Sequence, residues 1–215
     1  MKQFVVVGLG RFGSSVARTL AESGYNVLAI DNDEERVQEL SNEVTHAVEA
    51  DATDEEALRT LGVRNFDVAV VSIGDNVHAN ILSTLILKEL GVPYVVTKAK
   101  DSLHGKILTK VGADRIVYPE RDMGVRIAHN LTSSNVLDYL EFAPDYSIVE
   151  IIASPEMVGK SLAQLELRSK YGVNVMAIKR GKNLNITPGA NDKILEGDVL
   201  IVMGKNENLD KLKKV

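Results

Sequence analysis

The sequence predicts an α/β protein, with a doubly wound parallel Rossmann sheet followed by a small α+β domain. Apolar strand-like runs alternate with helix-like segments from Met1 to about Pro119, as expected where crossover helices join parallel strands. A glycine-rich turn at residues 8–13 lies between the first strand and the first helix. Beyond Pro144 the runs are shorter and are separated by turn residues, which is typical of a smaller mixed domain.

Six strands and five helices are expected in the first domain. The predicted strands are Phe4–Val7, Asn26–Ile30, His46–Ala50, Val68–Ser72, Tyr94–Lys98 and Arg115–Tyr118. The predicted helices are Arg11–Glu22, Glu34–Glu43, Glu55–Leu61, Val77–Leu90 and Leu103–Val111. Four of these helices are followed by a glycine, at the position that needs a left-handed cap: Gly24, Gly62, Gly91 and Gly112.

The segment from Asp122 to Glu141 predicts a long helix, which Ser133-Ser134 could interrupt, because its apolar residues recur at helical spacing. Such an apolar helix needs a covering surface, and we favour a second subunit over the chain's own C-terminal domain. Ala143-Pro144-Asp145 predicts a turn and a boundary. The expected division is residues 1–121 for the nucleotide-binding domain, 122–143 for a linking and dimerisation helix, and 144–215 for the second domain.

The last part of the chain predicts a small α+β unit. Its expected strands are Ser147–Ala153, Val173–Arg180, Asn183–Ile186 and Val199–Met203, and its expected helices are Leu162–Tyr171 and Asn206–Lys214. A unit of about 70 residues has a marginal hydrophobic core. Pairing with another copy of the chain would enlarge that core.

Composition excludes several classes of function. The chain has 215 residues, no cysteine and a formal charge of −5, which excludes disulfides and thiolate metal sites and argues against a nucleic-acid surface. No apolar run approaches the roughly 20 residues of a membrane helix, and Met1-Lys2-Gln3 does not open a signal peptide. We therefore expect a cytoplasmic protein without nucleic-acid binding or direct membrane insertion.

The glycine turn predicts binding of nucleotide phosphates. Gly8 permits the tight turn, Gly10 lets a pyrophosphate approach the backbone, and Gly13 lets helix and strand pack closely. The helix N-terminus adds free N–H groups and partial positive charge. Asp31 closes the next strand, where a carboxylate accepts hydrogen bonds from ribose and disfavours a 2′-phosphate. The alternative is a glycine turn that binds no ligand.

Further candidate residues surround this turn. Arg11 could pair with the terminal phosphates of a mononucleotide, or could be a solvated first-turn arginine. Asp51 and Thr53 could flank adenine, or either could cap the helix that begins near Glu55. The expected cofactor-binding residues are Gly8, Gly10, Arg11, Phe12, Gly13, Asp31, Asn32, Asp51, Ala52, Thr53, Ser72, Ile73 and Gly74.

The sequence lacks signs of catalytic groups. All 4 histidines precede residue 130, so the small domain has none, and we expect His46, His78, His104 and His129 to be structural. No His–carboxylate pair or Lys/Tyr acid–base unit is apparent there. This pattern favours a nucleotide sensor over an enzyme. The alternatives are an NAD-dependent oxidoreductase and, less favoured, a redox-sensing DNA-binding regulator.

Several segments together carry a resemblance to a known family. They are Gly8–Gly13, Ala50–Thr53 and Gly112–Glu120, followed by a small second domain. The whole chain resembles the regulator-of-potassium-conductance (RCK) family, and specifically the cytosolic subunit of Ktr/Trk-type potassium uptake systems. The resemblance implies a regulatory subunit that binds ATP or ADP, or NAD(H) in some members. It also implies dimers that assemble as an octameric ring on a membrane-embedded potassium translocation subunit, whose flux the ring gates.

The resemblance also implies roles for individual residues. Arg11 would contact phosphates, Asp31 the ribose, and Asp51 and Thr53 the adenosine region. Glu120 would help to bind a cation, divalent Mg or Ca or monovalent Na, although a first-turn helix acid is the alternative. The second domain would be a regulatory domain that binds cyclic di-AMP, unless its aliphatic residues form an ordinary dimer core. The corresponding positions are Leu162, Leu165, Leu167, Arg168, Asn174, Val175 and Pro188.

Overall fold

The computed structural model describes residues 1–131 and 136–212. The chain divides into two compact units, Met1–Pro119 and Glu120–Val215. We call these the N-terminal and the C-terminal domain and describe each by itself. The predicted break at Ser133-Ser134 and the predicted helix end at Lys214 lie outside the described residues.

The N-terminal domain is built on a six-stranded sheet with the order β3-β2-β1-β4-β5-β6. Every neighbouring pair of strands is parallel. The sheet is therefore doubly wound, as predicted, and its direction of winding reverses between β1 and β4. The strands are β1 (Gln3–Val7), β2 (Asn26–Asp31), β3 (His46–Glu49), β4 (Val68–Val71), β5 (Tyr94–Lys98) and β6 (Arg115–Val117).

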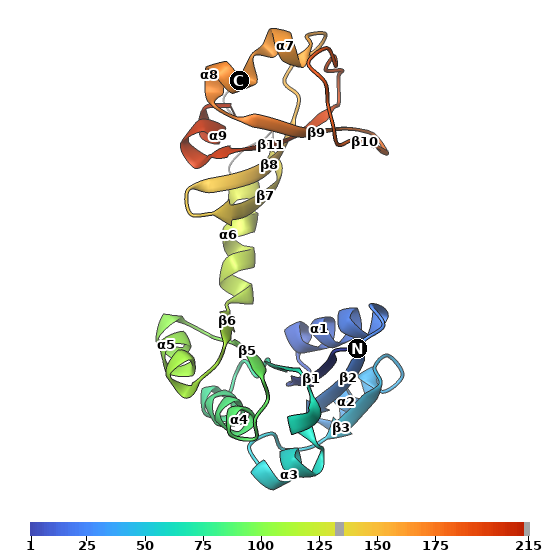
Figure 1. Ribbon diagram of the computed structural model, residues 1–215, viewed down its shortest axis with the longest axis vertical. Coiled ribbons are helices and arrows are strands. Elements are labelled where there is room, and N and C mark those ends of the chain that lie inside the picture. Colours follow the sequence, from blue (N-terminus) through green and yellow to red (C-terminus); the bar gives the residue numbers. More distant parts are fainter. Residues whose placement is uncertain (132–135, 213–215) are drawn as a thin grey trace. The chain divides into compact units, whose positions relative to one another are not determined.

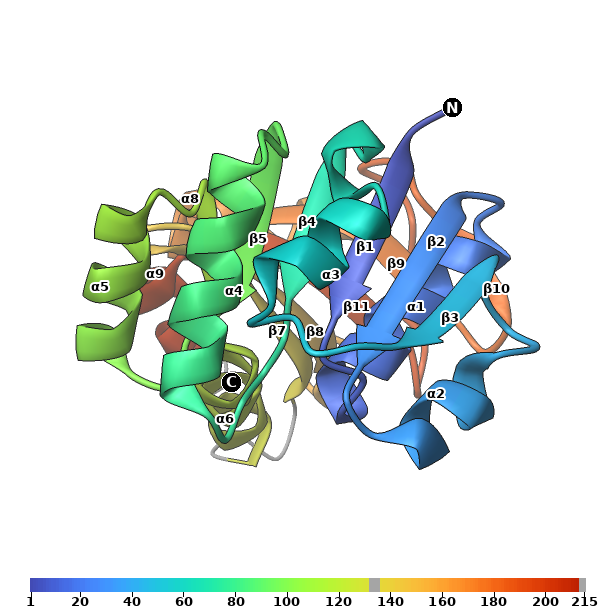
Figure 2. The same cartoon turned by 90° about the horizontal axis from the view of Figure 1, so that it is seen from below.

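Helices cover both faces of this sheet. Figure 2 shows α1 and α2 on one face and α3, α4 and α5 on the other. Residues of β1 alternate between the two resulting cores, with Val5 and Val7 in one and Val6 in the other. Burial on both faces explains the uninterrupted apolar run. The helices are α1 (Arg11–Glu22), α2 (Glu34–Leu40), α3 (Glu55–Thr60), η1 (Val63–Asn65), α4 (Val77–Glu89) and α5 (Ser102–Val111).

Capping residues set the ends of these helices. The glycines predicted as caps all have positive φ, with values of 85° at Gly24, 70° at Gly62, 89° at Gly91 and 108° at Gly112. The alternative that Asp51 or Thr53 caps α3 is wrong. The cap is Asp54, whose carboxylate accepts hydrogen bonds from the backbone N–H groups of the first turn of α3.

The C-terminal domain consists of α6 and an antiparallel sheet with its own helices (Figure 1). The strand order is β10-β9-β11-β8-β7. One apolar core joins the sheet to α7, α8 and α9 through residues such as Leu165, Leu200 and Leu209. The elements are α6 (Pro119–Leu131), β7 (Val136–Ala143), β8 (Tyr146–Ile152), α7 (Leu162–Leu165), α8 (Leu167–Tyr171), β9 (Asn174–Arg180), β10 (Asn183–Asn185), β11 (Val199–Lys205) and α9 (Asn206–Leu212).

The prediction of a helix up to Glu141 is wrong, because residues from Val136 onward form strand β7. This strand pairs with β8, and its register shifts at two places along the pair. The shifts interrupt the two-residue alternation that marks a strand, so the apolar residues happen to fall at helical spacing. Asp145, with φ of 65°, lies in the tight turn of this hairpin. The predicted turn at Ala143-Pro144-Asp145 is therefore the turn of this hairpin.

The helix predicted from Leu162 to Tyr171 is divided in two. Glu166 has φ of 50° and ends α7 before α8 begins. This left-handed residue changes the direction of the chain, and Leu165 and Leu167 on either side of it are both buried. A local pattern of apolar residues does not reveal such a kink, since both halves remain helical.

Candidate functional site

The glycine turn joins β1 to α1 at the carboxyl edge of the parallel sheet. Gly8 has φ of +88°, a conformation that residues with a Cβ rarely adopt. A Cβ on Gly13 would overlap the Gly8 carbonyl oxygen and the Ser72 hydroxyl. Gly13 therefore permits the close approach of α1 to the ends of β1 and β4.

The N-terminus of α1 is accessible to a ligand on the side of Gly10. A Cβ on Gly10 would meet nothing within 4 Å. Gly10 is the N-cap of α1, and no side chain among the described residues caps this helix. Backbone N–H groups of the first turn consequently have no acceptor within the helix and carry its partial positive charge. This geometry suits a phosphate group.

Asp31, at the end of β2, holds the glycine turn in place. Its carboxylate accepts a hydrogen bond from the Leu9 backbone N–H at 2.5 Å and another from the Asp33 N–H at 3.0 Å. The Arg36 guanidinium lies 3.6 Å from the same carboxylate. Asp31 is only 6% exposed. It is thus a structural part of the turn, and any bond to a ribose would use the remaining acceptor positions of its oxygens.

Two further predicted segments lie at the ends of neighbouring strands. After β3, the Asp51 carboxylate accepts hydrogen bonds from the Thr53 backbone N–H at 2.8 Å and the Thr53 hydroxyl at 2.7 Å. These two bonds lower the pKa of Asp51, so this exposed group is an anion at neutral pH. After β4, the Ser72 hydroxyl donates to the Gly8 carbonyl oxygen and joins this strand end to the glycine turn.

The structure therefore brings most of the predicted nucleotide site to one edge of one sheet. The carboxyl ends of β2, β1 and β4 are adjacent, and they carry Asp31, the glycine turn and Ser72 respectively. Arg11 and Asn32 are exposed, and Phe12 is half-buried. The Arg11 guanidinium forms no ion pair or hydrogen bond with the described part of the chain.

One polar residue at this edge is absent from the predicted set. Asn80 on α4 is fully buried, and its side-chain amide donates to the Ile73 carbonyl at 2.7 Å and the Lys98 carbonyl at 3.2 Å. The sequence contains a signal for it, because Asn80, Ser83 and Thr84 form a polar face on a helix that is otherwise mostly apolar. Buried polar groups of this kind are usually hydrogen-bonded.

The histidines differ in their environments. His46 and His78 are exposed, whereas His104 is buried. The His104 Nδ1 accepts a hydrogen bond from the Lys100 backbone N–H at 3.2 Å, and its Nε2 has no partner among the described residues. Burial lowers the pKa of His104, and the charge of Asp101 partly opposes this. The side chain of His129 lies outside the described residues.

The predicted cation ligand, Glu120, lies in the first turn of α6 and is exposed. Within residues 1–131 and 136–212, no group of three or more His, Asp or Glu side chains could hold a metal ion. Glu120 is therefore not part of such a group within the described residues.

The residues predicted for a second ligand are only partly accessible. Leu165 and Leu167 are buried in the core of the C-terminal domain, so an isolated chain does not present them to a base. Arg168 and Asn174 are exposed, while Leu162, Val175 and Pro188 are half-buried. These five residues are available to a ligand on the protein surface.

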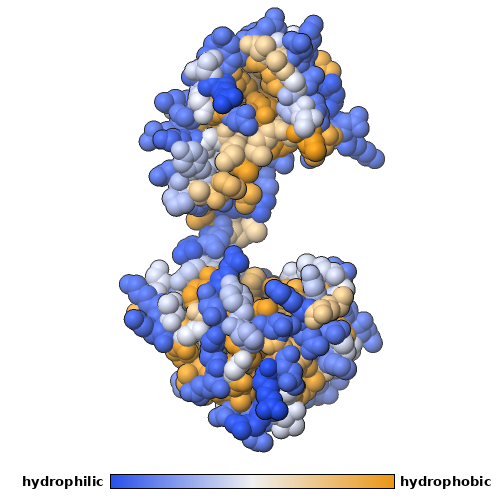
Figure 3. All heavy atoms as spheres, viewed as in Figure 1, coloured by the Kyte–Doolittle hydropathy of each residue, from blue (hydrophilic) through white to orange (hydrophobic). Residues whose placement is uncertain are grey.

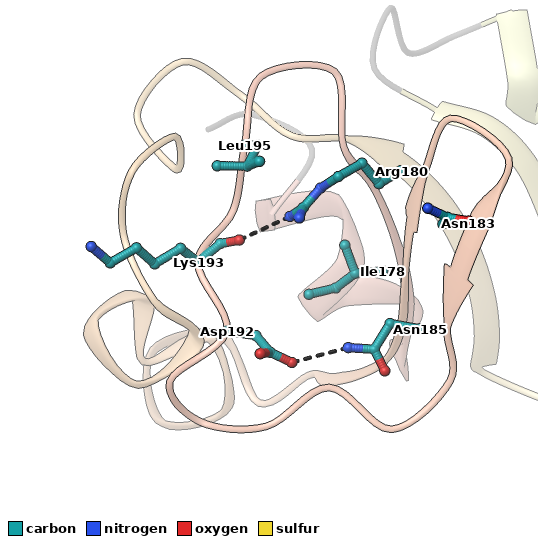
Figure 4. Close-up of a pocket in the computed structure, with 7 residues that line it drawn as sticks. All are labelled: Ile178, Arg180, Asn183, Asn185, Asp192, Lys193 and Leu195. Carbon is teal, nitrogen blue, oxygen red and sulfur yellow. Dashed lines mark hydrogen bonds between the residues drawn. The ribbon is translucent and has the colours of Figure 1, made fainter.

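A separate hollow of about 290 Å³ lies in the C-terminal domain (Figure 4). Two of the charged side chains in its wall, Arg180 and Asp192, are hydrogen-bonded within the chain. Arg180 donates two hydrogen bonds of 2.8 Å to the fully buried Asp198, and Asn185 donates to Asp192 at 3.0 Å. The Arg180 guanidinium lowers the pKa of Asp198. The residues that line the hollow are Ile178, Arg180, Asn183, Asn185, Asp192, Lys193 and Leu195, and none of them is predicted to bind the second ligand.

Comparison with known proteins identifies relatives along the whole chain. The TrkA-N domain family matches residues 4–119, and the TrkA-C domain family matches residues 146–215. The chain is 50% identical to Ktr system potassium uptake protein C of Bacillus subtilis, with 99% of this chain and 96% of that protein covered. It is 46% identical to Ktr system potassium uptake protein A of the same bacterium, with 97% and 94% covered.

Solved structures show the same fold. The RCK domain of GsuK aligns with a TM-score of 0.71 at 18% identity, covering 99% of this chain and 47% of that chain. The GsuK channel bound to NAD aligns with a TM-score of 0.56 at 23% identity, covering 100% of this chain and 38% of that chain. At these identities the comparison establishes the architecture.

Proposed function

This chain belongs to the family of Ktr and Trk potassium uptake proteins, and from that premise we propose that it is a nucleotide-binding regulatory subunit of a potassium uptake system. The observation that carries the proposal is the uncapped N-terminus of α1 beside Gly10, where a Cβ would meet nothing within 4 Å. A phosphate bound there would accept hydrogen bonds from the first-turn N–H groups.

We propose ATP and ADP as the principal ligands. Arg11 is exposed at the start of α1, and its guanidinium has no partner among the described residues. A guanidinium in that position can pair with the terminal phosphates of a mononucleotide. Asp31 would bind the ribose, and Asp51 and Thr53 would lie at the adenosine. NAD(H) is the competing ligand, because Asp31 also suits its unphosphorylated ribose.

Two further ligands are part of the proposal. Glu120 would help to bind a Mg, Ca or Na ion near the γ-phosphate across the dimer, with the other ligands supplied from outside this chain. Cyclic di-AMP would bind the C-terminal domain through Arg168, whose exposed charge suits a phosphate, and through Asn174 and Pro188. Leu162 and Val175 would pack against its bases.

The proposed partner is a membrane-embedded potassium translocation subunit. No helix within the described residues has the length and apolar character needed to cross a bilayer. We propose that the protein acts in the cytoplasm at the inner face of the membrane, as a dimer that assembles into an octameric ring. Exposed apolar residues on α6 support self-association, namely Met123, Val125, Ile127 and Leu131. Figure 3 shows hydrophobic residues at the surface of the C-terminal domain.

In this mechanism the nucleotide changes the shape of the ring without being consumed. A ligand shifts such an equilibrium only as far as its affinity differs between the two shapes. ATP and ADP differ by one phosphate, and Arg11 is placed to detect it. The competing function is an NAD-dependent oxidoreductase, which would require acid–base groups beside the bound cofactor.

Titration calorimetry of the full chain with ATP, ADP and NADH tests the proposed ligands. We expect saturable binding of ATP and ADP, with no nicotinamide-coupled turnover against a panel of metabolites. Arg11→Ala should weaken the binding of ATP more than the binding of AMP or adenosine, because it removes only a phosphate contact. Turnover of NADH would instead establish the oxidoreductase, and equal losses across the series would leave Arg11 without a phosphate role.

A further inference from the structure

The side-chain amide of Asn80 connects three elements of the N-terminal domain. Its Nδ2 donates to the carbonyl of Ile73, after β4, and to the carbonyl of Lys98, the last residue of β5. Its Oδ1 accepts a hydrogen bond from the Thr97 hydroxyl at 3.1 Å. Asn80 itself lies on α4 and is 0% exposed. Both amide hydrogens and the amide oxygen are therefore used inside the protein.

The bond to Ile73 determines the course of the chain after β4. Strand β4 ends at Val71, so Ile73 lies beyond the regular ladder of the sheet. A backbone carbonyl in this partly buried position needs a donor, because leaving it unsatisfied is unfavourable. The Nδ2 of Asn80 is that donor, at 2.7 Å. The amide thus fixes the position of the segment Ile73-Gly74, which follows the strand.

The Ile73-Gly74 segment packs directly on the glycine turn. A Cβ on Gly8 would stand 2.9 Å from the Ile73 backbone nitrogen, which is closer than real Cβ atoms approach. The neighbouring Ser72 hydroxyl donates to the Gly8 carbonyl oxygen. Interiors this closely packed transmit small displacements. A shift of Ile73 therefore moves one wall of the glycine turn.

We propose that Asn80 is a positioning residue of the nucleotide site. It holds the Ile73-Gly74 segment against Gly8 and so maintains the geometry that a phosphate needs at the start of α1. Because Asn80 is fully buried, it acts through the backbone and does not touch the ligand. This inference rests on the proposed nucleotide binding and adds a residue to it.

The test compares Asn80→Ala and Asn80→Asp with Ser83→Ala. Ser83 lies on the same helix and is 0% exposed, but its hydroxyl has no hydrogen-bond partner among the described residues. Ser83→Ala is therefore a matched control for the substitution of a buried polar residue on α4. Asn80→Asp retains the shape and the acceptor oxygen but places a carboxylate against two carbonyl oxygens.

ATP affinity is measured by titration calorimetry at low temperature, where circular dichroism verifies that each variant is fully folded. We expect both Asn80 variants to bind ATP about tenfold more weakly or worse, a change of about 1.4 kcal/mol. The ATP affinity of Ser83→Ala should stay within about twofold of the wild type, since this substitution breaks no bond to the Ile73-Gly74 segment.

Should the Asn80 variants not fold, Thr97→Val provides the second test. It keeps the volume but removes the hydroxyl that donates to the Asn80 Oδ1, and a weakened ATP affinity with a folded protein is expected. If Asn80→Ala has lower thermal stability but unchanged ATP affinity, the inference is overturned and the proposed function stays intact. The same result for Thr97→Val has the same meaning where the Asn80 variants do not fold. A loss of ATP affinity in Ser83→Ala equal to that in the Asn80 variants would also overturn the inference. A wild-type protein that binds neither ATP, ADP nor NADH would overturn the proposed function itself, and the inference with it.

Discussion

Replacement of Asp31 is expected to affect folding as well as ligand binding. In the structure its buried carboxylate accepts hydrogen bonds from the backbone N–H groups of Leu9 and Asp33. Leu9 is 3% exposed, so Asp31→Ala leaves that N–H without water or another acceptor. Hydrogen bonds to a charged group contribute about 1.5–3 kcal/mol each. The Asp33 N–H is partly accessible to water, which limits its share of the loss.

We therefore expect Asp31→Ala to lower the free energy of unfolding of the N-terminal domain by about 2–4 kcal/mol. For a domain of this size, that corresponds to a decrease in Tm of about 10 °C. Asp31→Asn keeps one acceptor oxygen and the side-chain shape. It should lower the free energy of unfolding by about half as much as Asp31→Ala. Asp31→Ala should also weaken adenine nucleotide binding about tenfold in the folded protein.

Differential scanning calorimetry of the full chain measures these changes. The transition of the N-terminal domain should move to lower temperature, while that of the C-terminal domain, which contains none of these contacts, should not. Asp31→Ala with an N-terminal transition within about 2 °C of the wild type would refute the argument that this carboxylate stabilises the glycine turn.

Three further outcomes are expected. Arg180 lowers the pKa of Asp198, so the pKa of this carboxyl is lower in the folded than in the unfolded protein. The stability that this difference contributes is present above about pH 4 and is lost as the pH falls through the folded pKa. Acid titration of the C-terminal transition should show this loss, and Asp198→Asn should flatten it. Arg180→Ala should lower the free energy of unfolding measured in urea at pH 7, because it leaves the fully buried Asp198 carboxylate without its guanidinium partner. Light scattering at micromolar concentration should give a mass well above the 23.4 kDa of one chain, and charged substitutions at Met123 and Ile127 should reduce it; a monodisperse wild-type monomer would exclude the proposed assembly.

The sequence by itself determined the parallel sheet, the order of its elements and the location of the glycine turn. These features follow from local rules. Residues buried on both faces make the central strands β1, β2 and β4 largely apolar runs, and the left-handed caps require glycine at positions such as Gly24 and Gly112. The crowding around Gly13 likewise agrees with the role that its position in the turn predicts.

Only the tertiary structure decided the role of β7 and the contacts of the buried polar groups. The register shifts between β7 and β8 hide the strand period, and they exist only when the two strands are paired. The bonds from Asn80 to Lys98 and from Leu9 to Asp31 join residues that are 18 and 22 positions apart along the chain. No local pattern specifies such pairs, because each depends on where separate strands end once the sheet has formed.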